Sequence, residues 1–344
     1  MSASTNQANA TGNQANATDN QTNATGNHTS ATGTIFSTSA STISIEQLEK
    51  KLRALKGKEY IPNALLELVA RTALLQREAV KRVEVTLVEK DIASAEDHEE
   101  GDPLLERKYF PYDKTVTAQV FGALLGMFCA AGGELGTAAA NLRGYMEEGK
   151  ISIDAACTAV LRDDEGFFER WAERLPQAPS MIRFLALSSL MPSVEHVAQQ
   201  LAKRHQSENL WPYSHCPICG SEPLMGRVMP SADGPDGDAT GDTDACTQRE
   251  DTCSFCRHTY VAAEEQCPFC LNRGPDAISV YTADNAPTWH LHVCTACRAY
   301  LKVVDYTADD SVSIPVLDDL ETLALDILAR QQDLKRTTPS AWGF

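Results

Sequence analysis

Eight cysteines fall into four CxxC pairs in the C-terminal part of this chain, a spacing typical of metal sites. The pairs are Cys216/Cys219, Cys253/Cys256, Cys267/Cys270 and Cys294/Cys297. A CxxC turn folds so that both of its sulfurs can face one centre, and a tetrahedral thiolate site needs two such turns. Four pairs therefore predict two four-cysteine sites.

The gaps between the pairs predict which pairs share a metal. Only ten residues, "RHTYVAAEEQ", separate the second pair from the third, enough for one returning strand, whereas the two longer gaps can each hold a hairpin. We therefore expect sequential grouping, with an interleaved cross-brace as the alternative. The expected first site is Cys216, Cys219, Cys253 and Cys256, and the expected second site is Cys267, Cys270, Cys294 and Cys297.

Other residues near the pairs are weaker candidates for ligands. Four histidines are near in sequence, but eight cysteines already satisfy two sites, and alternation in "TWHLHVC" places two of these histidines on the exposed face of a strand. They are His215, His258, His290 and His292. Thiolates suit both zinc and iron, so the ligand type does not choose between these metals. A thioredoxin-like enzyme would need one CxxC at a helix N-terminus rather than four in turn-rich chain.

The residue after each pair bears on the geometry of the turn. Gly220 follows the first pair and suits a residue with positive φ. Arg257, Leu271 and Arg298 stand at the equivalent places, where the turn is either strained or of another type.

Three cysteines lie outside the pairs. Cys129 and Cys157 lie within helical patterns and are expected to pack in the core. Cys246 is expected to be a free thiol on an acidic loop insertion at 229–252. The run "DGDATGDTD" in that insertion lacks the closing glutamate of a calcium loop.

The pattern along the chain predicts an α+β protein in four parts. Residues 1–44 contain a repeat, "NQANATG", with no large apolar residue, and are expected to be disordered. Residues 45–210 predict an α-helical bundle, 211–310 the small double metal domain with rubredoxin- or zinc-ribbon-like knuckles, and 311–344 a terminal helix and tail.

Three helical patterns give specific expectations. "NALLELVARTALLQREAV" predicts a helix that buries Leu65, Leu68, Val69 and Thr72, and residues 115–147 predict a central helix or helix pair. A helix is expected to stop at Pro192, with Ser193 capping the next. The last helix is expected to bury a stripe formed by Leu317, Leu320, Ala324, Ile327 and Leu328.

Charge and hydropathy exclude several classes of partner. The formal net charge of −17 over 344 residues disfavours nucleic acid and anionic membranes. The most apolar window, "VFGALLGMFCAAGG" at 120–133, is too short and glycine-broken to span a bilayer, and the N-terminus lacks a signal peptide pattern. The expected location is cytoplasmic, and the expected partners are proteins, with a homodimer left open.

With these motifs in hand, the chain resembles the formate dehydrogenase accessory protein E (FdhE) family. The resemblance is carried by "LWPYSHCPICGSEP", "CSFCRHTYVAAEEQCPFC" and "HVCTACRAYLKVVDY", in this order after a helical half. It covers roughly residues 45–344 and is strongest from 178 to 306; the asparagine-rich tail and the acidic insertion depart from the family pattern.

The resemblance implies a function and a metal. Such proteins are cytoplasmic, non-catalytic maturation factors that act on the catalytic subunit of molybdenum- or tungsten-dependent formate dehydrogenases. Iron is the metal that the resemblance implies, held by the eight paired cysteines, with zinc as the alternative. A zinc-ribbon nucleic-acid-binding or structural interaction protein and a CxxC redox enzyme are the alternative functions.

Overall fold

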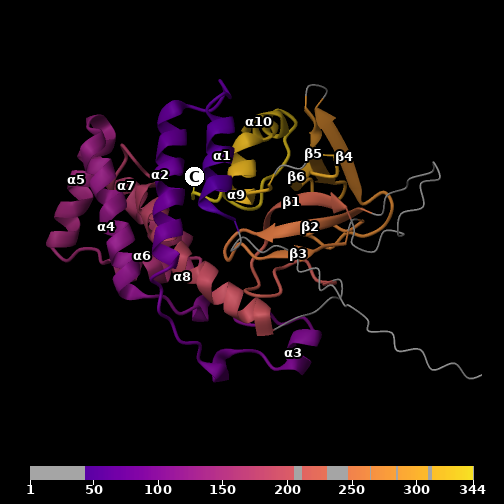
Figure 1. Ribbon diagram of the computed structural model, residues 1–344, viewed down its shortest axis with the longest axis horizontal. Coiled ribbons are helices and arrows are strands. Elements are labelled where there is room, and N and C mark those ends of the chain that lie inside the picture. The colour runs from indigo at the N-terminus through magenta and orange to yellow at the C-terminus, as the bar shows by residue number, and fades with distance from the viewer. Residues whose placement is uncertain are drawn as a thin grey trace, which may run out of the picture. The chain divides into compact units, whose positions relative to one another are not determined.

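The computed structural model describes residues 43–204, 211–230, 247–263, 265–283, 286–308 and 312–343. These residues belong to one compact unit, Ser37–Phe344 (Figure 1). Within this unit, helices occupy the N-terminal half and a six-stranded sheet follows, with two further helices at the end. The prediction of an α+β fold with a helical first half is confirmed.

The N-terminal half contains, among its described residues, eight α-helices and two short 3-10 helices. They are α1 (Ile45–Leu55), α2 (Asn63–Val80), η2 (Glu89–Asp91), α3 (Ala95–Glu99), η3 (Arg107–Tyr109), α4 (Lys114–Ala131), α5 (Gly133–Glu147), α6 (Ile153–Leu161), α7 (Glu165–Arg174) and α8 (Met181–Arg204). Serine or aspartate side chains accept hydrogen bonds from first-turn N–H groups of several helices, such as Ser44 at α1 and Asp113 at α4. The chain therefore marks these helix starts locally.

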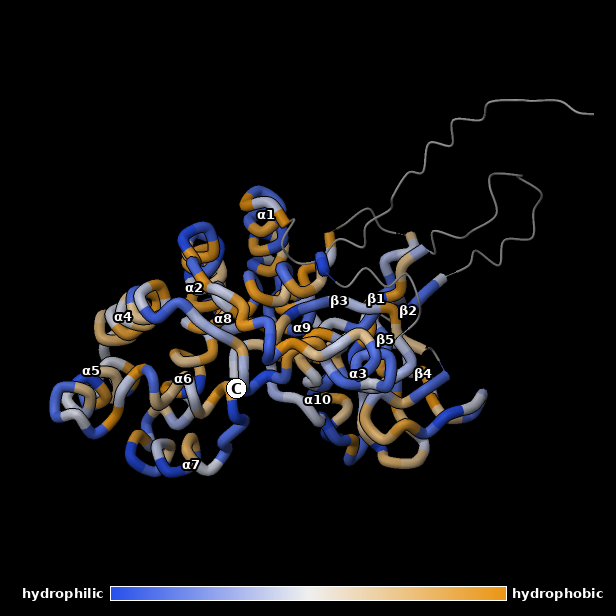
Figure 2. Tube along the Cα trace, turned by 90° about the horizontal axis from the view of Figure 1, so that it is seen from below, coloured by the Kyte–Doolittle hydropathy of each residue, from blue (hydrophilic) through white to orange (hydrophobic). Residues whose placement is uncertain are grey.

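Helix α2 has the predicted bounds but a rotated buried face. Val69 and Thr72 are buried as expected, Leu65 and Leu68 are only partly covered, and Leu66 and Ala73 are buried as well. Figure 2 shows hydrophobic and hydrophilic residues alternating along α2. The expected stripe was right for two of its four residues; the other two differ because "LLELVARTALL" is apolar on two adjoining faces, and packing against α8 selects between them.

Helix α4 is the most apolar long helix, and it continues through Gly122 and Gly126 without a break. By length and composition it could cross a membrane, with 39% of its apolar window buried inside the protein. Core helices of globular proteins meet the same criteria, and Phe128 of α4 packs on Phe184 of α8 with ring centroids 5.4 Å apart. The helix pair expected at 115–147 is α4 and α5.

Helix α8 runs unbroken through Pro192, so the predicted stop at this proline was wrong. A proline has no N–H, and this leaves the carbonyl of Ser188, four residues earlier, without its helical donor. Gln76 of α2 supplies the missing hydrogen bond with its side-chain amide, at 2.8 Å. Ser193 does not cap a helix; its buried hydroxyl accepts from the N–H of Asp113.

The six strands of the described residues form one sheet in the order β3-β2-β1-β6-β5-β4. They are β1 (Pro223–Pro230), β2 (Thr247–Cys253), β3 (Thr259–Val261), β4 (Ile278–Ala283), β5 (Ala286–Cys294) and β6 (Tyr300–Asp305). All neighbours are antiparallel except β1 and β6, which pair in parallel with Gly226 opposite Val303. Each half of the sheet repeats one unit: a CxxC turn, a hairpin, a second CxxC turn and one further strand.

The ends of the expected acidic loop insertion lie in this sheet. Met229 and Pro230 end β1 and residues 247–252 belong to β2, while 231–246 lie outside the described residues. Acidic residues enter the strand because arginines neutralise them: Glu250 pairs with Arg227 at 2.6 Å, and Asp251 pairs with Arg249 at 3.0 Å. All four side chains are buried.

The single terminal helix expected from the sequence is two helices, α9 (Pro315–Glu321) and α10 (Leu323–Gln331). The hydroxyl of Thr322 donates to the carbonyl of Asp318 at the break. The break rotates the second half of the expected stripe, so that Leu325 and Ala329 are buried while Ile327 and Leu328 are exposed.

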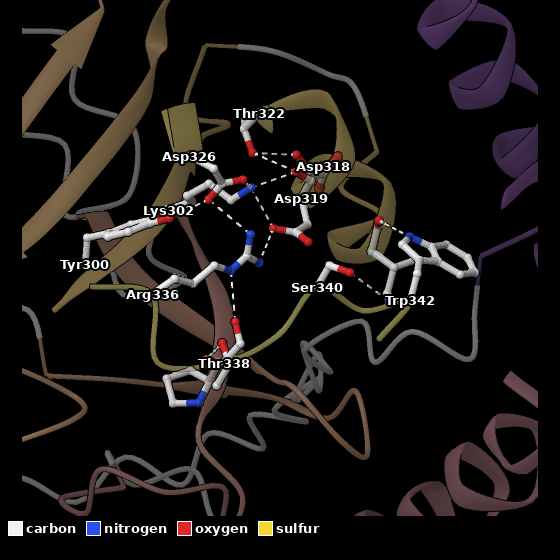
Figure 3. A network of polar contacts seen from close by, with 12 residues as sticks. Tyr300, Lys302, Asp318, Asp319, Thr322, Asp326, Arg336, Thr338, Ser340 and Trp342 are labelled. Atoms are coloured by element: carbon white, nitrogen blue, oxygen red, sulfur yellow. Dashed lines mark hydrogen bonds and ion pairs between the residues drawn. The ribbon is translucent and has the colours of Figure 1, made fainter. Parts of the chain in front are cut away.

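A buried ionic network joins α9, α10 and the chain that follows to the sheet (Figure 3). The ammonium of Lys302 on β6 lies 2.6 Å from Asp319 and 2.7 Å from Asp326, and Arg336 contacts the same two carboxylates. Lys302 and Asp319 are 1% and 3% exposed as side chains. The ion pairs compensate each buried charge for the hydration that it loses, so the network holds the C-terminal segment against β6.

Candidate metal centres

The first cysteine group gathers four thiols from two turns at one end of the β1–β2 hairpin. The sulfurs of Cys216 and Cys256 are 3.5 Å apart, and those of Cys219 and Cys253 are 3.4 Å apart. A tetrahedron with metal–sulfur bonds of about 2.3 Å has edges of about 3.8 Å, so these separations suit a shared metal. They are far longer than a disulfide bond of about 2.05 Å.

The second group repeats this arrangement beside β4 and β5. The sulfurs of Cys267 and Cys297 are 3.8 Å apart, and those of Cys270 and Cys294 are 3.6 Å apart. In each group all four sulfurs lie within 4.8 Å of one another, and both groups have the members expected from sequential grouping. The described potential metal-ligating clusters contain cysteine alone, without histidine.

All four CxxC turns share one backbone geometry. The N–H of the first cysteine in each pair bonds the carbonyl five residues later, as between Cys216 and Ser221 at 2.9 Å. The residue after each pair has positive φ: 76° at Gly220, 63° at Arg257, 62° at Leu271 and 59° at Arg298. The open question about the three non-glycine positions is thereby answered: the turn type is the same. Each costs about 1–2 kcal/mol of backbone strain.

The two groups differ in access to solvent. All four cysteines of the first group are at most 3% exposed, whereas in the second group Cys270 is exposed and Cys297 is half-buried. The same turn geometry therefore builds one enclosed site and one open site. Ligand exchange needs access for the incoming group, so a metal held in the open group would have the more direct route out.

The thiols within each group have unequal acidity. Burial raises the pKa of Cys294, but N–H donors from Cys297 and Ala296 outweigh burial and lower it to about 7. Burial raises the pKa of Cys267 far above its ordinary value. In the first group, burial raises the pKa of Cys216, whereas at Cys219 hydrogen bonds from the other three cysteines outweigh burial and lower the pKa. Each group therefore contains a thiol whose pKa is lowered by its neighbours, Cys219 in the first and Cys294 in the second, and a bound cation would favour ionisation of all four.

The first group is enclosed by a segment from the helical half. Main-chain N–H groups of Leu104, Leu105 and Arg107 donate to the carbonyls of residues 217–219, at 2.9, 2.9 and 3.2 Å. The guanidinium of Arg107 also lies 4.6 Å from the ring centroid of Phe255. Sequence reasoning missed this segment, because "DPLLER" has no pattern that indicates a partner more than a hundred residues away.

Comparison with known proteins finds similarity to one family. Residues 277–342 match the family model described as FdhE, C-terminal domain. Three curated relatives are named protein FdhE homolog: one from Aquifex aeolicus is 24% identical over 48% of this chain and 53% of its own length. Those from Haemophilus ducreyi and Glaesserella parasuis are 29% and 30% identical, over 49% and 43% of this chain and 49% and 44% of their own lengths. The chain is similar to proteins of the FdhE family. The resemblance found in the sequence is confirmed.

A solved structure extends the likeness to the fold. The crystal structure of the FdhE protein from Pseudomonas aeruginosa superposes with a TM-score of 0.60, covering 86% of this chain and 94% of that one at 19% identity. At this identity the match shows a shared fold. The chain spans about half the length of the curated FdhE relatives it matches.

The remaining sequence candidates have other roles in this FdhE fold. His215 lies 2.8 Å from the carbonyl of Gly101, and His290 lies 2.9 Å from that of Pro287. Cys157 is fully buried among apolar residues, and burial raises the pKa of its thiol to about 12. Cys129 packs against the core and is partly exposed, and Cys246 lies outside the described residues.

Cations near the cysteines are mostly paired elsewhere. Arg227 pairs with Glu250 and Lys302 with Asp319, so neither serves mainly to screen thiolate charge. Arg257, in contrast, is buried directly after the second knuckle pair, and its guanidinium donates to the main-chain carbonyl of Ala341 and not to a carboxylate. Burial lowers its pKa, while negative charge at Glu195, Cys253 and Cys256 acts in the opposite direction.

Proposed function

We propose that this protein is a non-catalytic accessory factor for the maturation of molybdenum- or tungsten-dependent formate dehydrogenase. It binds the catalytic subunit of that enzyme in the cytoplasm through its metal-bearing domain. The observation that carries the proposal is the pair of four-cysteine groups, each built from two knuckles of the same backbone geometry, in a chain that is similar to FdhE proteins.

The eight paired cysteines are proposed to hold two metal ions, one in each group. Thiolate coordination suits both the sulfur separations and the sets of four cysteine donors. It also suits the main-chain N–H groups that lie 3.4 Å from cysteine sulfurs, those of Ile218, Phe255 and Phe269. We propose iron, with zinc as the alternative, because thiolate donors accept either metal. The metal would stabilise the knuckles when bound.

A binding role fits these centres better than thiol redox catalysis. The four described CxxC motifs lie in turns next to strands, and not at helix N-termini where a low-pKa catalytic cysteine is usually found. Each also has its two sulfurs committed to a group of four. A metal with four thiolate ligands has no free ligand position for a substrate. A protein with two such sites can still present a surface to a partner.

The proposal is tested by capture of the formate dehydrogenase catalytic subunit from cells that make both proteins. We expect the wild-type chain to retain the subunit, and Cys253→Ser and Cys294→Ser to lose it together with one metal each. Cys129→Ser is the matched control, because this cysteine belongs to neither group. Failure of the wild-type chain to retain the subunit would overturn the proposal; undiminished capture by both metal-site variants would overturn the role of the metal domain.

A further inference from the structure

The two edges of the sheet differ in how they are protected. Strand β3 at one edge has three residues, of which Thr259 and Tyr260 are buried. Strand β4 at the other edge has six residues, "ISVYTA", and pairs among the described residues only with β5. Native proteins usually guard a long edge with lysine, proline or a bulge that turns the edge away from partners. β4 has no lysine and no proline, and its one register shift lies at its end, between Thr282 and Ala283. Most of its residues have a high β-propensity.

Exposed apolar side chains gather at this edge. Tyr281 and Val280 on β4 are 58% and 53% exposed, and Leu328 on the neighbouring helix α10 is 47% exposed. Alternation along a strand places Tyr281 and Val280 on opposite faces of the sheet. Tyr281 lies on the face that α10 covers, where Leu328 is also found.

A groove of about 520 Å³ lies between β4, β5 and α10. Its apolar lining includes Leu291 and Val293 from β5 and Leu325 and Ala329 from α10. The groove also reaches Cys294, so it adjoins the open four-cysteine group. Unpaired strand edge, apolar groove and open metal group therefore form one continuous surface.

The charge beside the groove would be negative with a divalent metal bound in the open cysteine group. A divalent metal in a four-thiolate site leaves a net charge of about −2, and the open group exposes Cys270 to solvent. Exposed Asp276, whose main-chain oxygen accepts a hydrogen bond from the hydroxyl of Thr295 in the groove, adds a further carboxylate. Arg298 at the rim, which donates to the carbonyl of Gln332, offsets one of these charges.

We infer that the β4 edge and its groove bind an extended segment of a partner protein in which apolar residues alternate with basic ones. The segment adds a strand to β4 through main-chain hydrogen bonds and inserts alternate apolar side chains between Tyr281 and Leu328. Its basic side chains lie on the other face, and those at the end beside Ile278 come near the open cysteine group. Main-chain pairing gives affinity, and the groove and charge give selectivity. The inference rests on the proposed function only for the identity of the partner and for the metal charge.

A second copy of this chain is a poorer occupant of the same edge. Each copy has a formal net charge of −17, so two copies repel each other. A basic segment gains from the charge that a second copy would oppose.

The test uses the full-length, metal-loaded chain and a short synthetic peptide in which valine and tryptophan alternate with arginine. We expect saturable binding by fluorescence anisotropy that weakens as salt is raised. A peptide with glutamate in place of arginine should bind at least about tenfold more weakly. A peptide of the original sequence, N-methylated along one backbone edge, should lose binding because it cannot donate to β4.

Matched variants locate the site on this surface. Tyr281→Lys and Leu328→Lys should each raise the Kd about tenfold or more, because each places a cation in the groove. Val280→Thr, which keeps an uncharged, β-prone residue on β4, and Ile327→Lys are the controls, since these exposed residues are adjacent but do not line the groove, and each should change the Kd less than about threefold. All four positions are exposed, so we expect every variant to fold.

Three outcomes would overturn the inference: no binding to the wild-type chain, equal weakening by groove and control variants, or a dimer in sedimentation that Tyr281→Lys disperses. The catalytic subunit provides a separate readout. If the wild-type chain captures it and Tyr281→Lys captures it equally well, the groove is not its docking site and the proposed function stands. If the wild-type chain fails to capture it while peptide binding holds, the proposed function fails and the groove stands.

Discussion

The side-chain amide of Gln76 on α2 donates to the main-chain oxygen of Ser188 on α8 at 2.8 Å, in place of the N–H that Pro192 lacks. Ser188 is buried, so no solvent is at hand to satisfy this oxygen. The contact holds α8 as one helix and ties it to α2. The local sequence would divide α8 at Pro192, and the contact with Gln76 of α2 keeps it continuous.

The first prediction concerns this contact. Gln76→Leu should lower the free energy of unfolding by about 1–3 kcal/mol, because it leaves a buried carbonyl unpaired. Pro192→Ala returns an N–H to α8, so the same Gln76 change should cost clearly less in that background. Urea denaturation of the two single variants and the double variant measures the coupling. An equal cost of the Gln76 change in both backgrounds would contradict the explanation.

The second prediction concerns the order of metal loss. A competing chelator should remove one equivalent of metal quickly from the open group of Cys267, Cys270, Cys294 and Cys297, and the second equivalent slowly from the enclosed group. Metal analysis and visible absorption after timed exposure follow both steps. Cys294→Ser should abolish the fast phase and Cys253→Ser the slow one. A fast phase that survives Cys294→Ser would show that exposure does not set the order.

Loss of the second metal should also affect the helical half. Residues 104–107 bond directly to the first knuckle, so opening the enclosed group removes partners of their N–H groups. We expect amide hydrogen exchange at residues 104–107 to rise with the slow phase and to stay unchanged during the fast phase. If hydrogen exchange at residues 104–107 rose with the fast phase instead, the enclosed group would not be the one that loses metal slowly.

The third prediction concerns Gly226 on β1. A Cβ atom there would lie 2.8 Å from a carboxylate oxygen of Asp251 and 3.2 Å from a methyl group of Val303. Gly226→Ala should therefore destabilise the protein by about 1–3 kcal/mol, since the buried Arg249–Asp251 pair has to move. Gly122→Ala is the control: a Cβ there meets nothing within 4 Å, and alanine should stabilise α4 by up to about 1 kcal/mol. Thermal unfolding distinguishes the two, and a neutral Gly226→Ala would contradict the packing argument.

The fourth prediction concerns pH and Asp319. Burial alone would raise the pKa of this carboxyl, but Lys302 and Arg336 outweigh burial and lower it. The folded pKa is therefore below the unfolded value of about 4, and the stabilisation is present above that value and is lost as the pH falls below it. Asp319→Asn should cost about 3 kcal/mol at neutral pH, because Lys302 stays buried with one carboxylate fewer.

Acid also releases thiolate-bound metal, so the informative quantity is the difference between wild type and Asp319→Asn. This difference should shrink as the pH is lowered from about 5 to about 3. Denaturant titrations at each pH measure it, with the exposed Asp333→Asn as the control variant. A difference that stays constant across this range would show that ionisation of Asp319 does not stabilise the fold.

The sequence by itself determined the cysteine grouping and most helix starts, because these depend on residues a few positions apart. CxxC spacing and the lengths of the gaps between pairs lead to the two sets of four, and polar caps such as Ser44 mark where helices begin. The repeated knuckle also follows from local backbone geometry, although Arg257, Leu271 and Arg298 show that its positive φ does not require glycine.

Only the tertiary structure decided features that depend on distant partners. Gln76 keeps α8 continuous through Pro192, and residues 104–107 enclose one cysteine group but not the other. Arg227 neutralises Glu250 in β2, a strand that composition alone predicts to be a loop. In each case a buried polar group or charge needs a partner far along the chain. Periodicity and spacing report on near neighbours, and carry no information about which distant segment will supply that partner.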